Sequence, residues 1–340
     1  MDHALPATKA CNDLQLPQVT EKSAGTILVN LKRAENEHTA RVAAANARVE
    51  AERAALEAAR QSAVSAGAEL EATLGAELEQ DWQQKVLPLW QEIQRLNETA
   101  GVSSPEWSRQ SVEAWTPSPA FIPAIQFGRV EVDLSAAGVP ADPRFALPDP
   151  PKVSVPLSLT FPEQGSLVLE TNDSGDAEVI GAMHNVLLRL LAGMPPGKLS
   201  LTLIDPVGLG ENFAGFMHLA DYEESLINRR IWTQREQIEE RLAFLNEHIE
   251  KMIQMYLRNE YATITEYNAQ AGSVAEKYHI LVVADFPANF SDVAVKRLQS
   301  IVSSGARCGV FVLLHWDRRQ TAPEGLVAEE LRKNSVCLRR

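Results

Sequence analysis

The segment Ser166–Leu191 constrains the fold of this chain more than any other stretch. It consists of a short apolar run, a turn made of Asp173, Ser174 and Gly175, and a longer segment with one apolar face. The order strand, turn, helix is the layout of a phosphate-binding loop, in which backbone N–H groups at a helix N-terminus hold phosphate. We therefore expect this segment to begin an α/β domain.

The two positions that carry the chemistry of such a loop hold other residue types here. A working loop needs a lysine to reach the outer phosphates and a Ser or Thr hydroxyl for magnesium. Asp176 follows Gly175 instead, and Ala177 comes next. A carboxylate there adds a repulsion on the order of 1 kcal/mol against phosphate near the surface. The sequence predicts a degenerate Walker A loop at residues 173–177, a vestigial nucleotide site whose helix N-terminus still allows weak anion binding.

Apolar runs and helical segments alternate from residue 166 onward. The runs read as strands at Ser166–Glu170, Leu199–Ile204, His279–Ala284 and Val310–Leu314. Helices are expected over residues 177–191, from Thr233, where Thr233 and Glu236 form a capping box, and from Ser291 to Val302. Fully apolar strands that alternate with helices indicate a parallel sheet covered on both faces.

Two of these strands end in a carboxylate, Asp205 and Asp285. In a P-loop ATPase a strand-end Asp holds the magnesium water, and the next residue, usually Glu, activates the attacking water. Phe286 follows Asp285 and cannot accept a proton. Asp285 is thus a candidate for the magnesium position, or it caps the following turn. Asp205 either caps its own turn or lines the site.

Some other signals are weak. Gly208-Leu209-Gly210 lacks the third glycine of a dinucleotide fingerprint, because Phe213 stands there. No histidine pairs with a Ser or Cys at a recognisable catalytic spacing. His279 and His315 flank strands, and we expect them to be packing or edge residues.

Residues 28–99 predict a helical arm, which follows a tail at residues 1–27. A heptad pattern of apolar residues runs through Val42, Val49, Leu56, Ala63 and Leu70. The pattern is typical of a coiled coil or a helical hairpin with an Ala-rich seam, and Gly67 and Gly75 mark candidate bends. The alternatives are a coiled coil that binds a partner or a second copy, and a solvated helix packed on its own domain.

Residues 100–165 predict a Pro-rich linker. Eleven of the 19 prolines fall between Pro105 and Pro162, and Ile125–Val132 reads as an edge strand. The domain boundary is expected here, with the α/β domain at residues 166–340.

The totals exclude several classes of protein. The 340 residues suffice for about two domains. A net charge of -13 disfavours a chain that grips nucleic acid by itself. The cysteines Cys11, Cys308 and Cys337 form no CxxC, so zinc is not indicated and a reducing compartment fits. No apolar run approaches the ~20 residues of a membrane span, and the N-terminus lacks a secretion signal. These features indicate a cytoplasmic protein.

Residues 166 to about 319 resemble the motor domain of the FtsK/SpoIIIE family of DNA translocases. LVLETNDSGDA resembles that family's first strand and phosphate loop, and LTLIDPVGLGENFAGFMHL its second strand with an Asp-Pro pair. The long helix and the segment before the last strand match at Arg258, Asn259, Tyr267, Asn268, Arg307 and Gly309. The resemblance implies a RecA-like fold, ATP with magnesium, ring-shaped oligomers and double-stranded DNA.

The departures from the family pattern are Asp176, Ala177 and Phe286. We therefore expect a non-catalytic or regulatory domain of a larger ATP-driven DNA translocase. A competent ATPase domain then lies in the same or another chain, DNA is contacted only within the assembly, and ATP and Mg²⁺ bind weakly at most. Asp205, Phe286 and Arg307 are candidates for lining the pocket, although Arg307 also fits a plain surface role. The alternatives are an active translocase and a coiled-coil scaffold that binds no nucleotide.

Overall fold

The computed structural model describes residues 21–103, 106–133, 142–145, 152–172, 176–228, 230–258 and 260–339. The chain divides into two compact units, with the boundary between Trp82 and Gln83. None of the described helices is long and apolar enough to cross a membrane.

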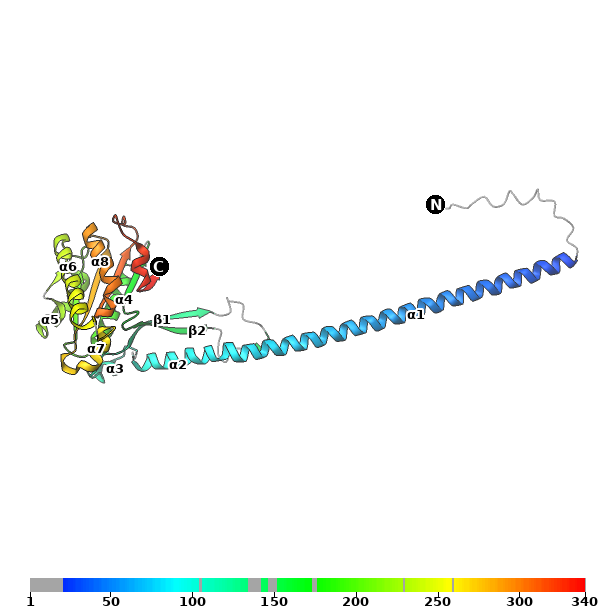
Figure 1. Cartoon of the computed structure of the whole chain (residues 1–340), viewed down its shortest axis with the longest axis horizontal. Helices are drawn as coiled ribbons and strands as arrows, with labels where there is room; N and C mark the ends of the chain where they lie inside the picture. Colours follow the sequence, from blue (N-terminus) through cyan, green and yellow to red (C-terminus); the bar gives the residue numbers. More distant parts are fainter. Residues whose placement is uncertain are drawn as a thin grey trace. The chain divides into compact units, whose positions relative to one another are not determined.

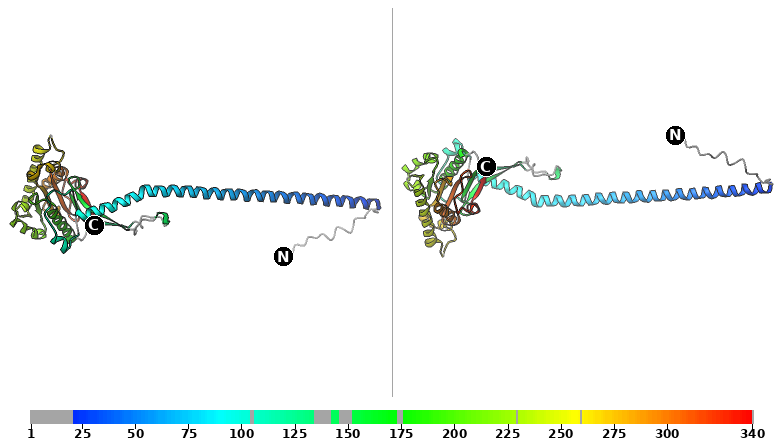
Figure 2. Two further views of the ribbon diagram at one scale, coloured as in Figure 1. Left: turned by 90° about the horizontal axis from the view of Figure 1, so that it is seen from below. Right: turned by 90° about the horizontal axis from the view of Figure 1, so that it is seen from above.

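The first unit is built on one long helix, α1 (Glu21–Asp81), which is 61 residues long. Its sequence is rich in alanine and free of proline, and pairs such as Arg48–Glu52, 3.2 Å apart, lie one turn apart on its surface. Figure 2 shows α1 as an unbroken helix that passes through Gly67 and Gly75. The expected bends are therefore absent from α1, and so is the hairpin that they would form.

The second unit begins with a helix and a small antiparallel sheet. After a π-helical turn (Trp82–Val86), α2 (Leu87–Ser103) packs on the pair β1 (Ala124–Asp133) and β2 (Lys152–Thr160). Asn97 fixes this contact: its Nδ2 donates to the Ser154 carbonyl at 2.6 Å, and its Oδ1 accepts from Arg129 at 3.0 Å. The strands expected before residue 165 are this pair. A short helix, α3 (Arg109–Glu113), lies between α2 and β1.

The described residues of the main domain form a six-stranded parallel sheet with the order β5-β4-β6-β7-β3-β8. Figure 1 shows strands of this domain among the helices labelled α4, α6 and α8. Its strands are β3 (Leu167–Thr171), β4 (Leu199–Ile204), β5 (Ile231–Trp232), β6 (Tyr278–Phe286), β7 (Val310–Asp317) and β8 (Val336–Arg339). The four central strands are almost completely buried. This burial explains why they read as continuous apolar runs rather than as alternating patterns.

Helices cover both faces of the sheet. α6 (Arg235–Met252), α8 (Asp292–Ser304) and α9 (Ala328–Lys333) form one layer, in which α8 touches both of the others. The crossover through α4 (Asp176–Gly193) runs along the strand order in the opposite direction, which places α4 on the other face because such crossovers are right-handed. The fold is the α/β class expected, a parallel sheet flanked by helices.

Shorter elements connect these layers. They are η3 (Pro143–Phe145), η4 (Glu211–Asp221), α5 (Glu224–Ile227), η5 (Ile253–Leu257), α7 (Ile264–Ala271), η6 (Gly272–Val274) and η7 (Ala306–Cys308).

Of the two side-chain caps at helix starts, Ser291 and Thr233, the first is confirmed and the second is wrong. The Ser291 hydroxyl accepts a hydrogen bond from the Ala294 amide at 3.1 Å and caps α8. The capping box at Thr233 is not formed, because α6 begins at Arg235 after Gln234 and has no side-chain cap. The Thr233 carbonyl instead accepts a hydrogen bond from Asn289 at 3.0 Å.

Candidate functional site

The carboxyl ends of β3, β6 and β7 lie side by side at one edge of the sheet. Thr171 at the end of β3 pairs with Asp317, and Phe286 at the end of β6 pairs with Trp316. Ligands of open parallel sheets bind at this edge. Along the chain, β3 ends at Thr171 and α4 begins at Asp176.

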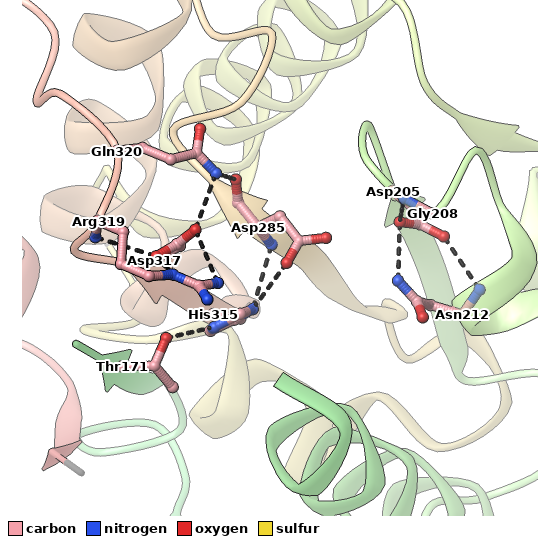
Figure 3. Close-up of polar contacts among 9 residues, drawn as sticks. All are labelled: Thr171, Asp205, Gly208, Asn212, Asp285, His315, Asp317, Arg319 and Gln320. Atoms are coloured by element: carbon pink, nitrogen blue, oxygen red, sulfur yellow. Dashed lines mark hydrogen bonds and ion pairs between the residues drawn. The ribbon is translucent and has the colours of Figure 1, made fainter. Parts of the chain in front are cut away.

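A buried histidine connects the three strand ends. His315 of β7 is fully buried, its Nε2 lies 3.0 Å from the Thr171 hydroxyl, and its Nδ1 lies 3.2 Å from Asp285 Oδ1 (Figure 3). The Asp285 backbone N–H also points at Nδ1, at 3.3 Å. These contacts place Asp285 against its own protein rather than toward open solvent.

The two contacts of His315 Nδ1 exclude each other. A ring nitrogen that carries hydrogen donates to the carboxylate, whereas one without hydrogen accepts from the amide. In the first case Nε2 accepts from the Thr171 hydroxyl, and in the second Nε2 donates to it. Both tautomers therefore keep a bond to Thr171 and to Asp285.

Asp285 has an unusual backbone. Its φ is 54°, in the left-handed region that few residues other than Gly, Asn and Asp adopt, and the pairing of β6 with β7 is irregular between Val283 and Phe286. Its side chain is 13% exposed, and Oδ2 has no hydrogen-bond partner among the described residues. One carboxylate oxygen is thus left for an outside ligand.

Phe286, the next residue, faces the protein interior. Its side chain is fully buried, with the Phe290 ring 5.0 Å and the Trp316 ring 5.9 Å from its own. The position that carries a water-activating group in P-loop ATPases is therefore a core position here. Phe286 does not lie in the site with Asp285.

Asp205 at the end of β4 binds its own loop (Figure 3). Its carboxylate accepts four hydrogen bonds of 3.0–3.1 Å, from the amides of Gly208, Gly210 and Asn212 and from the Asn212 side chain. The residue is fully buried. Because each carboxylate oxygen already accepts two hydrogen bonds, Asp205 organises the turn into η4 and leaves no acceptor for a ligand.

The same contacts explain the glycines that follow Asp205. A Cβ on Gly208 would lie 2.7 Å from the Asp205 carboxylate oxygens, and Gly210 has a φ of +94°. The Gly-Leu-Gly sequence is thus required by the way the chain wraps around Asp205.

Polar residues after β7 extend the site. Arg319 donates to both oxygens of Asp317, at 2.8 and 3.1 Å, and these bonds lower the pKa of Asp317. Gln320 Nε2 bridges the Asp317 carboxylate, at 3.2 Å, to the Asp285 carbonyl, at 3.4 Å (Figure 3). The bridge ties the segment after β7 to the end of β6.

Glu170 forms a separate cluster on the β8 side of β3. It is buried, and its carboxylate accepts hydrogen bonds from Arg332 at 2.7 and 3.0 Å. The carboxylate also forms ion pairs with Arg318, at 3.2 Å, and Arg339, at 3.5 Å. Burial by itself would raise the pKa of Glu170, but the Arg332 hydrogen bonds and the three arginine charges outweigh it and lower the pKa.

Of the other residues predicted for the site, Arg307 is not brought together with Asp285. Arg307 is exposed in η7, before β7, and so lies at the edge of the sheet opposite the strand ends. Ala177 is exposed in the first turn of α4. The positions Asp173, Ser174 and Gly175 lie outside the described residues, as does the side chain of Asp176.

The strand ends offer one carboxylate oxygen, Asp285 Oδ2, to a metal. No group of three or more His, Cys, Asp or Glu side chains suited to a metal occurs in the described part of the chain. Magnesium at nucleotide sites is held by one or two carboxylates and by substrate phosphates. Asp285 Oδ2 provides one such oxygen.

Sequence reasoning missed His315. We expected His315 to be a packing or edge residue, whereas it contacts both Thr171 and Asp285 and so joins their strands. A histidine inside an otherwise apolar strand was the available signal, because a buried polar ring needs partners.

Comparisons with known proteins give no match to a family or a curated sequence and only distant likenesses to solved structures. No family model and no curated protein matches. Among solved structures, EssC (ATPases 2 and 3) from Geobacillus thermodenitrificans is 16% identical with a TM-score of 0.43, over 66% of this chain and 39% of that one.

Two further structures give similar values. The pCW3 conjugation coupling protein TcpA with ATPγS is 14% identical, with a TM-score of 0.42, over 70% of this chain and 58% of its own. The cytoplasmic domain of the Thermomonospora curvata Type VII secretion ATPase EccC is 18% identical, with a TM-score of 0.41, over 68% of this chain and 25% of its own. The chain spans less than two thirds of each of these structures, and likenesses of this size assign no role to any residue.

Proposed function

We propose that this chain is a non-catalytic, regulatory domain with the fold of a nucleotide motor and that it acts within a larger ATP-driven DNA translocase. Its competent ATPase partner lies in the same or another chain. The observation that carries the proposal is the burial of Phe286 between Phe290 and Trp316, since this position would otherwise activate water. Asp176 and Ala177 in place of lysine and hydroxyl support it from the sequence.

The strand-end carboxylate has a structural use in this proposal. Asp285 contacts the buried His315 at 3.2 Å, and His315 bonds Thr171 at 3.0 Å, so the contacts tie three strand ends together. The one free oxygen of Asp285 allows weak Mg²⁺–nucleotide binding without turnover. Such a site can sense a nucleotide, but the residue that follows Asp285, the buried Phe286, cannot activate water to hydrolyse it.

Calorimetric titration of Mg²⁺–ATP into the full chain, paired with a phosphate-release assay with and without double-stranded DNA, tests the proposal. We expect no DNA-stimulated phosphate release, with weak binding or none. Release that Asp285→Asn abolishes and Arg235→Gln leaves unchanged would overturn the proposal in favour of an active translocase.

A second role rests on α1. Its heptad side chains Val42, Val49, Leu56 and Leu70 are all 45–73% exposed within the described part of the first unit. A 3.5-residue apolar repeat is buried when two helices wrap around each other. We propose that α1 pairs with α1 of a second copy, which makes the chain a scaffold as well.

Light scattering on the full chain tests this second role. The double variant Leu56→Glu and Leu70→Glu should turn a dimer into a monomer, because it places charges in the seam. Val64→Glu is the matched control, since Val64 is 66% exposed and lies off the heptad positions. A wild-type chain that is monomeric at all concentrations would contradict the pairing, without affecting the proposal on nucleotide turnover.

A further inference from the structure

A polar cavity opens at the β5 edge of the sheet, away from the strand ends already described. Its volume is about 530 Å³, and we call it the Trp232 cavity. It is lined by Glu224, Ser225, Asn228, Arg230, Trp232 and Arg241. β4 lies between β5 and β6, the strand that carries Asp285, and neither Asp285 nor His315 lines the cavity, so it is distinct from the site at Asp285.

Secondary structure fixes the base of the cavity. Trp232 in β5 pairs with Ile204 of β4, and its carbonyl accepts a hydrogen bond from the Asp205 amide at 2.9 Å. The Trp232 side chain is only 8% exposed. Arg241 projects from α6, so a strand and a helix hold the two residues in place.

Two guanidinium groups lie over the same indole ring. The Cζ atoms of Arg230 and Arg241 are 5.0 and 4.6 Å from the centroid of Trp232. Cation–π attraction holds each charge on the ring, but the two like charges repel each other. An anion bound between them would attract both guanidinium groups and so offset their repulsion.

Two buried donors in the cavity have no acceptor. Trp232 Nε1 and Arg241 Nε are both buried, and neither has a hydrogen-bond partner in the described part of the chain. Both groups can only donate. Buried donors are normally satisfied, so two unsatisfied ones on residues that line one cavity point to a ligand with several acceptor oxygens.

Among the described residues, one exposed ion pair involves the two arginines. Glu240 reaches only the Arg241 Nη2, at 3.2 Å, and its side chain is 68% exposed. Arg230 is exposed and makes no ion pair among the described residues. Glu224 is the acidic residue that lines the cavity, and Ser225 and Asn228 complete its polar wall.

We propose that the Trp232 cavity binds a phosphate group. A phosphate dianion matches two guanidinium charges and offers enough oxygens for the indole and Nε donors, whereas a carboxylate brings one charge and two oxygens. Arg230 and Arg241 hold the charge, and Trp232 Nε1 orients the anion. The geometry of the cavity does not distinguish free phosphate from a phosphate ester.

Calorimetric titration of the full chain at low salt tests the proposal, with inorganic phosphate, AMP and succinate as separate probes. We expect phosphate to bind, and Arg230→Gln to weaken it by about tenfold because a charge-assisted bond is lost. Trp232→Phe, which keeps the ring and removes the N–H, should weaken it by a few-fold. Glu240→Gln should strengthen it, since Arg241 Nη2 is then released.

Arg235→Gln is the matched control, because Arg235 is exposed on the same helix and outside the cavity. AMP binding with the same variant pattern identifies a phosphate ester, and its absence identifies the free ion. The proposal is overturned if phosphate does not bind at millimolar concentration, if succinate binds as tightly as phosphate, or if Arg230→Gln and Arg235→Gln bind alike. ATP binding that Arg230→Gln removes belongs to this cavity, whereas ATP binding that Asp285→Asn removes belongs to the strand ends.

Discussion

Asp205 and Asp285 are both aspartates at the carboxyl end of a buried parallel strand, yet their carboxylates differ in almost every contact. Asp205 is fully buried and accepts four hydrogen bonds from its own loop. Asp285 is 13% exposed, contacts His315 through one oxygen and leaves the other without a partner among the described residues. The position of a carboxylate at a strand end therefore does not fix its role, which depends on the groups that the folded chain places around it.

The largest expected effect is on Asp205. Asp205→Ala leaves three buried backbone amides and the Asn212 side chain without an acceptor, so we expect a loss of roughly 3–5 kcal/mol in the free energy of unfolding. Urea unfolding followed by circular dichroism measures it. Asp221→Ala, at an exposed position at the end of η4, is the control. A loss for Asp205→Ala no larger than that of the control would remove the contrast between the two aspartates.

A third carboxylate at the same edge sharpens the contrast. Glu170 is bonded by arginine side chains rather than by its own loop, and Glu170→Gln should cost about 2 kcal/mol of unfolding free energy at pH 7. Because the folded pKa of Glu170 lies below its usual value, its contribution is present above that value and is lost as the pH falls through the folded pKa.

The gap between wild type and Glu170→Gln should therefore be constant above about pH 5 and narrow below about pH 4.5. Urea unfolding at a series of pH values measures the gap, with the exposed Glu163→Gln as control. A gap that widens in acid would show that the arginines do not stabilise the ionised form.

The hydroxyl at Thr171 tests whether His315 organises the Asp285 side of the comparison. Thr171→Val keeps the shape and removes the hydroxyl that lies 3.0 Å from His315 Nε2, so we expect a loss of about 1 kcal/mol. Thr171→Ser retains the hydroxyl and should lose less. The order of the two variants in thermal unfolding is the measurement, and equal losses would mean that the bond contributes nothing.

The smallest effect is expected at Asp285. Asp285→Asn keeps a residue that tolerates the left-handed backbone and an oxygen for His315, so the unfolding free energy should change by about 0.5 kcal/mol or less. Asp285→Ala should cost about 1 kcal/mol more than this, because alanine disfavours that backbone. If Asp285→Asn proved as damaging as Asp205→Ala, the two carboxylates would be equally structural.

The strands of the main sheet could be predicted from the sequence because burial on both faces makes them continuous apolar runs. Leu199–Ile204 matches β4 at both ends, and the strand at residues 310–314 lies within β7, which continues through Asp317. The start of α8 at Ser291 was equally legible, since capping is local. The start of α6 was misplaced because the Thr233 carbonyl accepts a long-range hydrogen bond from Asn289, and the predicted capping box does not form.

The candidate site was less predictable than the fold. Asp205 and Asp285 look alike in sequence, and their difference comes from how residues 208–212 fold back on one carboxylate and how β7 places His315 against the other. The positions of Phe286 and Arg307 depend on the irregular end of β6 and on the direction of β7. Such facts arise from pairing between residues distant along the chain, which no local pattern contains.

The burial of Phe286 has a consequence for the evolutionary history of the domain. A single substitution of Phe286 by glutamate would place a charge between Phe290 and Trp316, where the cost of removing it from water opposes ionisation. Regaining a water-activating group would require the end of β6 to be rebuilt together with the loop at residues 173–177. If the domain is non-hydrolytic as proposed, change by single residues would pass through destabilised forms, so the core packing around Phe286 would oppose a return to hydrolysis.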